Sequence, residues 1–227
     1  MKRICRRHLA TATMLFWIIG IFDIASAQNK LVKSQKQNTM TIEQIKESLL
    51  GQWVSLAPEI RPSIAKNADG TMKPFYLTRD FTYLPGDKFQ LDVINSADAY
   101  GKVPLVKISI KGNIIWQGEH PIAQGAQKVK FTASEVYEVT PLIQGFADAM
   151  NQLAAKGFDK WEVNKTQSIL GKTFAPFGLS EGQIFAEYDL IYSFNDLLFW
   201  GARNVDGRGF DKEENRPTNL QIPLVRK

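Results

Sequence analysis

The sequence predicts a mainly β protein built from antiparallel strands with one or two short helices. Apolar residues alternate with polar ones along several segments, for example at Phe89, Leu91 and Val93, which is typical of half-buried antiparallel strands. Turn-forming residues separate these segments, and apolar residues follow helical spacing in only two places. Without an internal repeat, these features predict a single domain over residues 41–227.

Two helices are predicted. Residues 41–50 carry apolar side chains at positions 42, 45, 49 and 50, which is the spacing of one helix face, with Thr39 or Thr41 as N-cap and Gly51 after the last turn. Residues 141–158 carry apolar side chains at positions 142, 146, 149, 150 and 153. This second segment is predicted as a helix that connects two regions of sheet.

Three short sequences predict hairpin turns. Pro85-Gly86-Asp87 and Asn195-Asp196 each follow an alternating segment and contain residues that favour tight turns. Lys111-Gly112-Asn113 has the same character, so we expect two separate strands at residues 105–110 and 114–117, joined by this turn.

The composition excludes several classes of protein. The chain has 227 residues, of which 44% are hydrophobic and 22% charged, and this balance is typical of a globular protein. A single cysteine rules out a disulfide-bonded scaffold within the chain. The net charge of +5 raises the possibility of an anionic partner, depending on where the charge lies.

Much of the excess charge lies at the N-terminus. Lys2, Arg3, Arg6 and Arg7 precede an apolar stretch at residues 14–24, and Ala25-Ser26-Ala27 follows. A basic head, a short apolar segment and small residues at a cleavage position are typical of a secretory signal peptide over residues 1–27. The apolar stretch is shorter than the roughly 20 residues that span a bilayer. We therefore expect an exported protein, periplasmic or extracellular, with a polar linker at residues 28–40 and no stable transmembrane segment in the mature chain.

Removal of residues 1–27 changes what chemistry is available. This segment holds four basic and one acidic residue, so 24 basic and 22 acidic residues remain and the net charge falls to +2. Nucleic acid is therefore not expected as a partner. Cys5 and His8 are lost as well, leaving His120 as the sole imidazole, which excludes a cysteine nucleophile, a thiolate metal site and any site that needs two histidines. His120 itself lies in Gly118-Glu119-His120-Pro121, where we expect a solvated turn. No cofactor, metal site or catalytic residue is predicted.

Three spaced motifs carry a family resemblance. The first is Gly51-Gln52-Trp53-Val54-Ser55, the second Glu59-Ile60-Arg61-Pro62, and the third Phe75-Tyr76-Leu77-Thr78-Arg79-Asp80-Phe81. In this combination the chain resembles the domain of the adenomatosis polyposis coli down-regulated (APCDD) family, which includes secreted or membrane-tethered Wnt antagonists. The resemblance extends over residues 46–227. The motif residues it singles out are Gly51, Trp53, Ser55, Glu59, Arg61, Pro62, Leu77, Thr78 and Arg79.

The resemblance implies a large antiparallel sheet curved into an open, clam-like half-barrel whose concave face holds lipid. In the animal members it implies a pocket for the acyl chain of a lipidated Wnt protein. Those members have two such domains in tandem with several disulfides, including a cysteine directly before the glutamate of the second motif. Here Pro58 takes that place, and the chain resembles a single-domain, cysteine-free version.

A sheet with one apolar face must cover that face with helices, with itself or with a ligand, because apolar area left in water costs about 25 cal/mol per Å². The helix at residues 141–158 is one cover, and a ligand is the other. Strand alternation predicts the side chains that would line a ligand cavity, namely Phe81, Phe89, Leu91, Ile108, Ile110, Phe131, Tyr188 and Leu190.

Two groups of charged residues allow alternative interpretations. Glu59, Arg61 and Arg79 are either a clamp for a carboxylate or head group, since guanidinium binds carboxylates with two parallel hydrogen bonds, or a structural salt bridge between the first strands, which we favour. Glu187 and Asp189 lie two apart on one strand face. They are either an acid/base pair of a hydrolase or, as we expect, part of a solvated face.

The sequence therefore predicts a secreted or periplasmic, non-enzymatic binding protein that holds an apolar or lipidated ligand in a curved-sheet cavity. One alternative is a protein-protein interaction module that binds no lipid. Another is a carboxylate-dependent hydrolase that acts outside the cytoplasm.

Overall fold

The computed structural model describes residues 40–204 and 208–227, apart from the side chains of residues 62–66 and 72. The predicted signal peptide and all of the predicted linker except Met40 lie outside the described residues. Strands dominate the described chain, and the predicted mainly β class is confirmed. The strands are β1 (Gly51–Ser55), β2 (Glu59–Lys66), β3 (Met72–Leu84), β4 (Lys88–Ser96), β5 (Pro104–Glu119), β6 (Gln127–Pro141), β7 (Gln167–Ser168), β8 (Ala186–Phe194), β9 (Leu197–Trp200) and β10 (Leu224–Arg226), and the helical elements are α2 (Ile42–Leu49), α3 (Gln144–Leu153) and the 3-10 turns η1 (Ala175–Phe177) and η2 (Glu213–Asn215).

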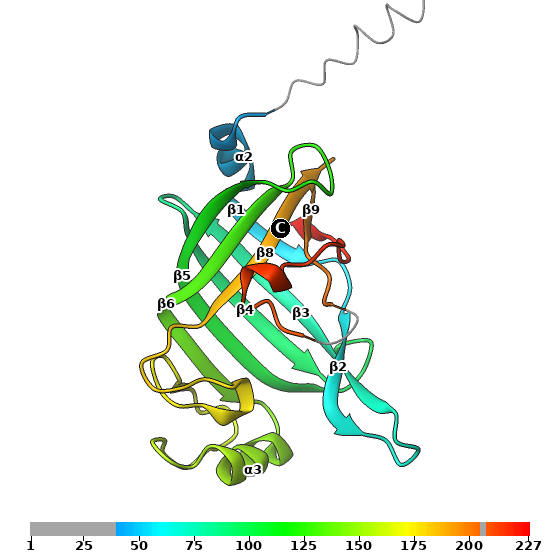
Figure 1. Cartoon of the computed structure of the whole chain (residues 1–227). Helices are drawn as coiled ribbons and strands as arrows, with labels where there is room; N and C mark the ends of the chain where they lie inside the picture. The colour runs from blue at the N-terminus through cyan, green and yellow to red at the C-terminus, as the bar shows by residue number, and fades with distance from the viewer. Residues whose placement is uncertain (1–39, 205–207) are drawn as a thin grey trace, which may run out of the picture. The chain divides into compact units, whose positions relative to one another are not determined.

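The strands form one antiparallel sheet that curves into a ring at one end and opens at the other (Figure 1). The hydrogen-bonded order is β1-β10-β9-β8-β6-β5-β4-β3, and β1 also pairs with β3 at residues 80–83, which closes the ring. Toward its N-terminal end, β3 pairs with β2 instead. In the same half of the sheet, β6 is no longer paired with β8 but with the two-residue β7. The barrel is therefore closed near β1 and interrupted between β2 and β7, where the described strands do not pair.

Two of the predicted hairpin turns are present. Pro85-Gly86-Asp87 joins β3 to β4, with positive φ angles of 76° at Gly86 and 57° at Asp87. Asn195-Asp196 joins β8 to β9, with φ angles of 48° and 57°. Asn195-Asp196 is a two-residue turn between the paired residues Phe194 and Leu197, and positive φ at both of its residues matches the twist of paired strands. Pro85-Gly86-Asp87 is instead a three-residue loop between the paired residues Leu84 and Lys88.

The predicted hairpin at Lys111-Gly112-Asn113 is wrong. These residues lie within the continuous 16-residue strand β5, and the pairing of β5 with β6 shifts register between Lys111 and Asn113. Gly112 is required there for space: a Cβ atom at this position would lie 1.8 Å from the backbone oxygen of Thr132. The glycine therefore marks a close approach of two strands at a bulge and not a turn.

We expect Gly112→Ala to lower the free energy of unfolding by about 1–3 kcal/mol, because the added methyl group forces the β5 and β6 backbones apart. Urea denaturation measures the change. Gly145→Ala is the matched control, since nothing lies within 4 Å of its added Cβ and alanine stabilises a helix by up to about 1 kcal/mol relative to glycine. Equal stability of the two variants would contradict the steric account.

The two α-helices lie at opposite ends of the sheet (Figure 1). In α2, Thr41 caps the N-terminus in a reciprocal pair of hydrogen bonds with Gln44, and Ile45 and Leu49 are buried in the core. The predicted second helix is shorter than expected and covers Gln144–Leu153. It packs on β6 and η1. Among the described residues, no helix is long and apolar enough to cross a membrane.

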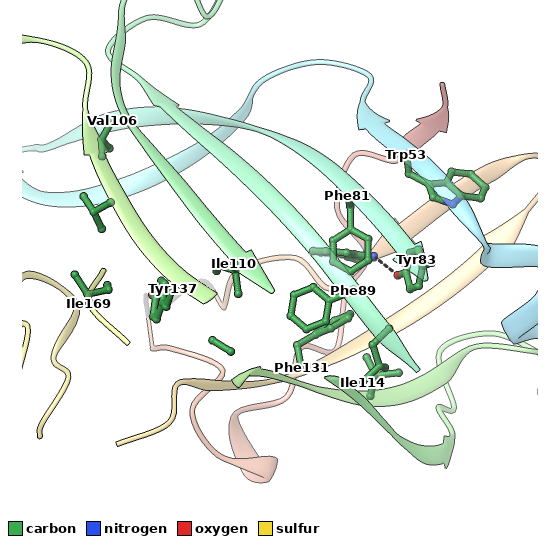
Figure 2. Packing of buried hydrophobic residues seen from close by; sticks show 14 of the residues in the cluster. Trp53, Phe81, Tyr83, Phe89, Val106, Ile110, Ile114, Phe131, Tyr137 and Ile169 are labelled. Atoms are coloured by element: carbon green, nitrogen blue, oxygen red, sulfur yellow. Dashed lines mark hydrogen bonds between the residues drawn. The ribbon is translucent and has the colours of Figure 1, made fainter. Parts of the chain in front are cut away.

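Aromatic side chains fill the closed half of the barrel. The ring of Phe81 is fully buried, 5.3 Å from Phe89, 5.6 Å from Phe131 and 4.6 Å from Trp200 between ring centroids. Figure 2 shows the rings of Phe81, Phe89 and Phe131, from β3, β4 and β6, close to one another, with Tyr83 beside them. The Trp200 Nε1 donates a hydrogen bond to the Tyr83 hydroxyl at 3.1 Å. The closed end is thus a packed core, and empty space must be sought toward the open end.

Candidate ligand-binding cavity

Two adjoining cavities lie on the concave side of the sheet, between the aromatic core and the open end. The larger has a volume of about 240 Å³ and the smaller about 20 Å³. They share lining residues from β4, β5, β8 and β9. The larger cavity is lined by Arg61, Phe75, Leu77, Arg79, Leu91, Val93, Ile108, Ile110, Tyr137, Phe185, Glu187, Asp189, Trp200, Arg203 and Phe210.

Strand alternation positions these side chains. On β3, Phe75, Leu77 and Arg79 are two residues apart and therefore share one face. The register continues that face across the sheet, since Phe81 pairs with Leu91, Leu91 with Ile110 and Ile110 with Tyr137. The next row contains Arg79, Val93 and Ile108. An arginine thus occupies an inward position that alternation would assign to an apolar side chain.

Six of the eight predicted lining residues lie on the cavities. Phe81, Phe89 and Phe131 line the smaller cavity, Leu91 and Ile110 line both, and Ile108 lines the larger. They come from β3, β4, β5 and β6, where one face of each strand points inward.

Tyr188 and Leu190 do not line either cavity, in contrast to the prediction. The inward positions of β8 are the alternate residues Glu187 and Asp189, which pair with Phe131 and Val129 of β6. On the other face of β8, Leu190 is fully buried and the Tyr188 ring lies 5.5 Å from the Arg216 guanidinium of the C-terminal segment. Because both faces of β8 are covered, the alternation of apolar residues does not indicate which face points inward.

The cavity also contains residues that sequence analysis did not select. Phe75, Leu77 and Val93 continue the same alternation as the predicted residues of β3 and β4, so an extension of that pattern would have found them. Trp200, Arg203 and Phe210 come from β9 and the segment after it, which the sequence does not place next to the concave face.

The charged motif residues meet at the open end. Glu59 forms an ion pair with Arg61 at 2.8 Å and a second ion pair with Arg79, whose Nη1 also donates a hydrogen bond to the carboxylate. The Gln221 amide, with its nitrogen turned toward Glu59, donates to both carboxylate oxygens at 2.7 Å. The favoured interpretation of these residues as a salt bridge between the first strands matches this geometry. One carboxylate is nevertheless shared between two guanidinium groups.

Arg61 keeps one donor without a partner. Its side chain is largely buried, and its Nη1 has no hydrogen-bond partner. Burial lowers the pKa of Arg61 from its ordinary value to about 10, with the attraction of Glu59 acting in the opposite direction and repulsion from Arg79 and Arg203 in the same direction. The guanidinium is therefore still charged at neutral pH.

The remaining motif residues support this arrangement. The Trp53 Nε1 donates to the Leu49 carbonyl at 2.7 Å, and the Trp53 ring lies under the Arg226 guanidinium. The Ser55 hydroxyl accepts from the Arg79 N–H at 2.8 Å, which connects the first motif to the third. Leu77 faces the cavity, Thr78 is half-buried, and Gly51 has a φ of 106° that favours glycine. Pro62 pairs with Pro74 across β2 and β3.

Glu187 and Asp189 do not form the expected solvated face, because both line the cavity. Burial raises the pKa of Glu187, while the guanidinium groups of Arg79, Arg61 and Arg203 lower it. Burial also raises the pKa of Asp189 from 3.8 to about 7, and its Oδ1 accepts from the backbone N–H groups of Leu190 at 2.7 Å and Gly201 at 2.9 Å. Asp189 is thus held in place by the backbone of two strands.

The raised pKa of Asp189 predicts a pH-dependent stability. The folded protein binds this proton more tightly than the unfolded chain, so the stabilisation is present below about pH 4 and is lost as the pH rises to about 7. Asp189→Asn keeps the Oδ1 acceptor and should remove this part of the slope in urea denaturation series measured across that range. Asp159→Asn, at an exposed position, is the control and should retain the wild-type slope. An identical slope in wild type and Asp189→Asn would contradict the prediction.

His120 is buried, which corrects the expectation of a solvated turn. Its Nδ1 accepts a hydrogen bond from the Ile122 N–H at 3.2 Å. Burial lowers its pKa, and the positive charges of Arg216 and Lys128 add to that effect. His120 lines neither cavity. Within the described residues, no three His, Cys, Asp or Glu side chains are grouped so that they could hold a metal ion.

A larger hollow, of about 390 Å³, is a surface groove between α2 and the β3–β4 turn. Three of its polar groups pair with one another: Asp87 forms a salt bridge with Lys46 at 2.9 Å and accepts from the Trp116 Nε1 at 2.9 Å. The cavity on the concave side is therefore the better candidate site, because it combines enclosure, apolar walls and an unsatisfied donor.

The sequence matches the model of a known protein family. The match covers residues 26–173, more than half of the chain, and the family is described as adenomatosis polyposis coli down-regulated 1. All three motifs and the strands from β1 to β7 lie within the matched range. The chain therefore belongs to the adenomatosis polyposis coli down-regulated family.

Proposed function

We propose that this protein is an exported, non-enzymatic binding protein that holds the apolar chain of a lipid or lipidated ligand in the concave cavity. The observation that carries the proposal is the cavity itself. Ten of its fifteen lining residues are apolar or aromatic, which is the composition of sites that bind apolar ligands. The proposed export rests on the signal-peptide pattern of residues 1–27.

The volume limits what kind of chain fits. Pockets for small molecules commonly measure about 300–1,000 Å³, and the cavity measures about 240 Å³. A single acyl chain matches this space better than a lipid with two chains. Family membership is consistent with such a ligand, since the resemblance implies a pocket for the acyl chain of a lipidated Wnt protein in the animal members. The proposal for this chain is limited to an apolar chain and does not include a Wnt protein.

Binding of an apolar chain is tested by extraction and by titration. Mass spectrometry of an organic extract from natively purified protein should recover a single-chain lipid. Calorimetric titration with dodecanol should show binding that Ile108→Trp weakens by at least about tenfold, since the larger side chain fills the cavity. Ile115→Trp, on the exposed face of the same strand, is the matched control and should bind as wild type does.

A protein without lipid in the extract and without affinity for dodecanol would contradict the proposal. That result would favour the alternative of a protein-protein interaction module. Exposed apolar side chains at Leu56, Ile60, Tyr100 and Val103 would then be the first positions to replace in a search for the partner surface.

The hydrolase alternative rests on Glu187 and Asp189, which both line the cavity. Asp189 is engaged by two backbone N–H groups, which suits a structural acid better than a proton-transfer group. Hydrolysis of the ester p-nitrophenyl dodecanoate by wild type, abolished in the double variant Glu187→Gln and Asp189→Asn, would contradict the non-enzymatic assignment. Equal rates for the two proteins would exclude this pair as catalysts.

A further inference from the structure

We infer that the ligand of this cavity is an amphiphile with an anionic head group, and that Arg61 binds this head group at the open end. The inference rests on the proposed function, which supplies the apolar chain, and adds the chemical class of the other end of the ligand. It depends on the sharing of Glu59 by two arginines, on the unpartnered donor of Arg61 and on the place of Arg61 in the lining of the larger cavity.

Arg61 and Arg79 share one carboxylate as their ion-pair partner. Glu59 forms ion pairs with both Arg61 and Arg79, so one negative charge serves two positive ones. The third group that contacts Glu59 is the Gln221 amide, which is neutral. Arg203 lines the same cavity, as do the carboxylic acids Glu187 and Asp189, so an anionic ligand is inferred from the unpartnered donor of Arg61 and not from a net charge.

The unpartnered donor makes an anion the complementary ligand. Arg61 is only 8% exposed, and its Nη1 is buried without a hydrogen-bond partner. Leaving a buried donor unpaired costs about 1–3 kcal/mol, and more for a charged group. A carboxylate or phosphate oxygen at Nη1 would remove this cost and form a charge-assisted hydrogen bond.

The geometry places the head group and the chain at opposite ends of one site. Arg61 comes from β2, at the interrupted end of the barrel, and lines only the larger cavity. The smaller cavity lies against Phe81, Phe89 and Phe131 in the closed half. A chain whose head group lies at Arg61 would therefore extend past Leu91 and Ile110, which line both cavities, toward these aromatic rings.

Glu187 faces the same arginines from β8. Its carboxylate lines both cavities and is stabilised electrostatically by Arg79, Arg61 and Arg203, while burial disfavours its charge. A ligand anion and an ionised Glu187 thus compete for one set of positive charges. Removal of the Glu187 charge should therefore strengthen the binding of an anionic ligand, whereas removal of the Arg61 charge should weaken it.

The test compares ligands with the same chain and different head groups. The ligands are dodecanoate, dodecyl phosphate and dodecanol, and binding is measured by calorimetric titration. The titration is done at about pH 8, where the carboxylate of dodecanoate is ionised. We expect at least one of the two anions to bind wild type at least about tenfold more tightly than dodecanol. Arg61→Gln should reduce this preference to about twofold or less, and Glu187→Gln should increase it.

The outcomes separate the two proposals. Equal binding of all three ligands by wild type would overturn the anionic head group and leave the apolar cavity in place. Binding of none would overturn the proposed function. Circular dichroism and thermal unfolding establish that the variants are folded, and the wild-type comparison of the three ligands stands without them.

Discussion

Replacement of Phe81 by alanine is expected to lower the free energy of unfolding by about 3–5 kcal/mol, the range for truncation of a buried aromatic side chain. Phe81 is fully buried. Its ring lies against four other aromatic rings, with centroid distances from 4.4 Å to Tyr83 up to 5.6 Å to Phe131. These rings come from β3, β4, β6 and β9, so the side chain connects strands on opposite sides of the barrel.

Urea denaturation of wild type and Phe81→Ala measures this effect. Phe194→Ala is the control, because Phe194 is 47% exposed and contacts only Tyr192 among the aromatic rings of the described residues. Phe194→Ala should lower the free energy of unfolding by less than about 1 kcal/mol. A Phe81→Ala variant no less stable than Phe194→Ala would show that the closed half of the barrel is not the main core.

Arg216→Met is expected to lower the free energy of unfolding by about 2–5 kcal/mol. The Arg216 Nη1 donates to the Val129 carbonyl at 2.7 Å and to the Asp189 carbonyl, and its Nη2 donates to the Gln117 Oε1 at 2.6 Å. Methionine preserves much of the apolar volume but leaves the two buried carbonyls without this donor, and an unsatisfied buried acceptor costs about 1–3 kcal/mol. Arg216 thereby attaches the C-terminal segment to β5, β6 and β8.

The same denaturation measurement on Lys212→Met provides the comparison, since Lys212 is exposed in the same segment. That variant should unfold as wild type does. If Arg216→Met also retains wild-type stability, the C-terminal segment does not depend on this guanidinium for its position over β8.

Most of the sheet could be predicted because local pattern and tertiary structure agree. β3, β4 and β5 each have one face toward the interior, and their alternation identified Phe81, Leu91 and Ile110 as inward residues. Asn195-Asp196 forms the expected turn because asparagine and aspartate tolerate the positive φ angles that a two-residue turn requires. The prediction of a turn at Gly112 was wrong because the sequence alone does not distinguish a glycine that allows two strands to approach closely from a glycine that allows a turn.

The site could be predicted only in part. The apolar wall follows from alternation, and the Glu59–Arg61–Arg79 group follows from the family motifs. The inward orientation of Glu187 does not follow from local sequence, because both faces of its strand carry buried side chains, Asp189 on one and Leu190 on the other. The unpartnered Nη1 of Arg61 likewise depends on where Glu59, Arg79 and Gln221 lie in three dimensions.

Stability and binding are thus assigned to different halves of one sheet. The closed half is filled by Phe81 and its aromatic neighbours, whereas the open half keeps a cavity whose charged rim includes Arg61. Burial of apolar area in the closed half stabilises the fold enough to allow an incompletely filled and partly unsatisfied site beside it.

The most direct test of a chain-binding cavity is a crystal structure of the protein with dodecanoate that carries bromine on its terminal carbon. The account predicts an anomalous bromine peak beside Leu91 and Ile110, at the end of the larger cavity that adjoins the aromatic core, with the carboxylate within hydrogen-bonding distance of Arg61. A peak outside the barrel, or an interior that stays free of the chain at saturating ligand, would contradict it.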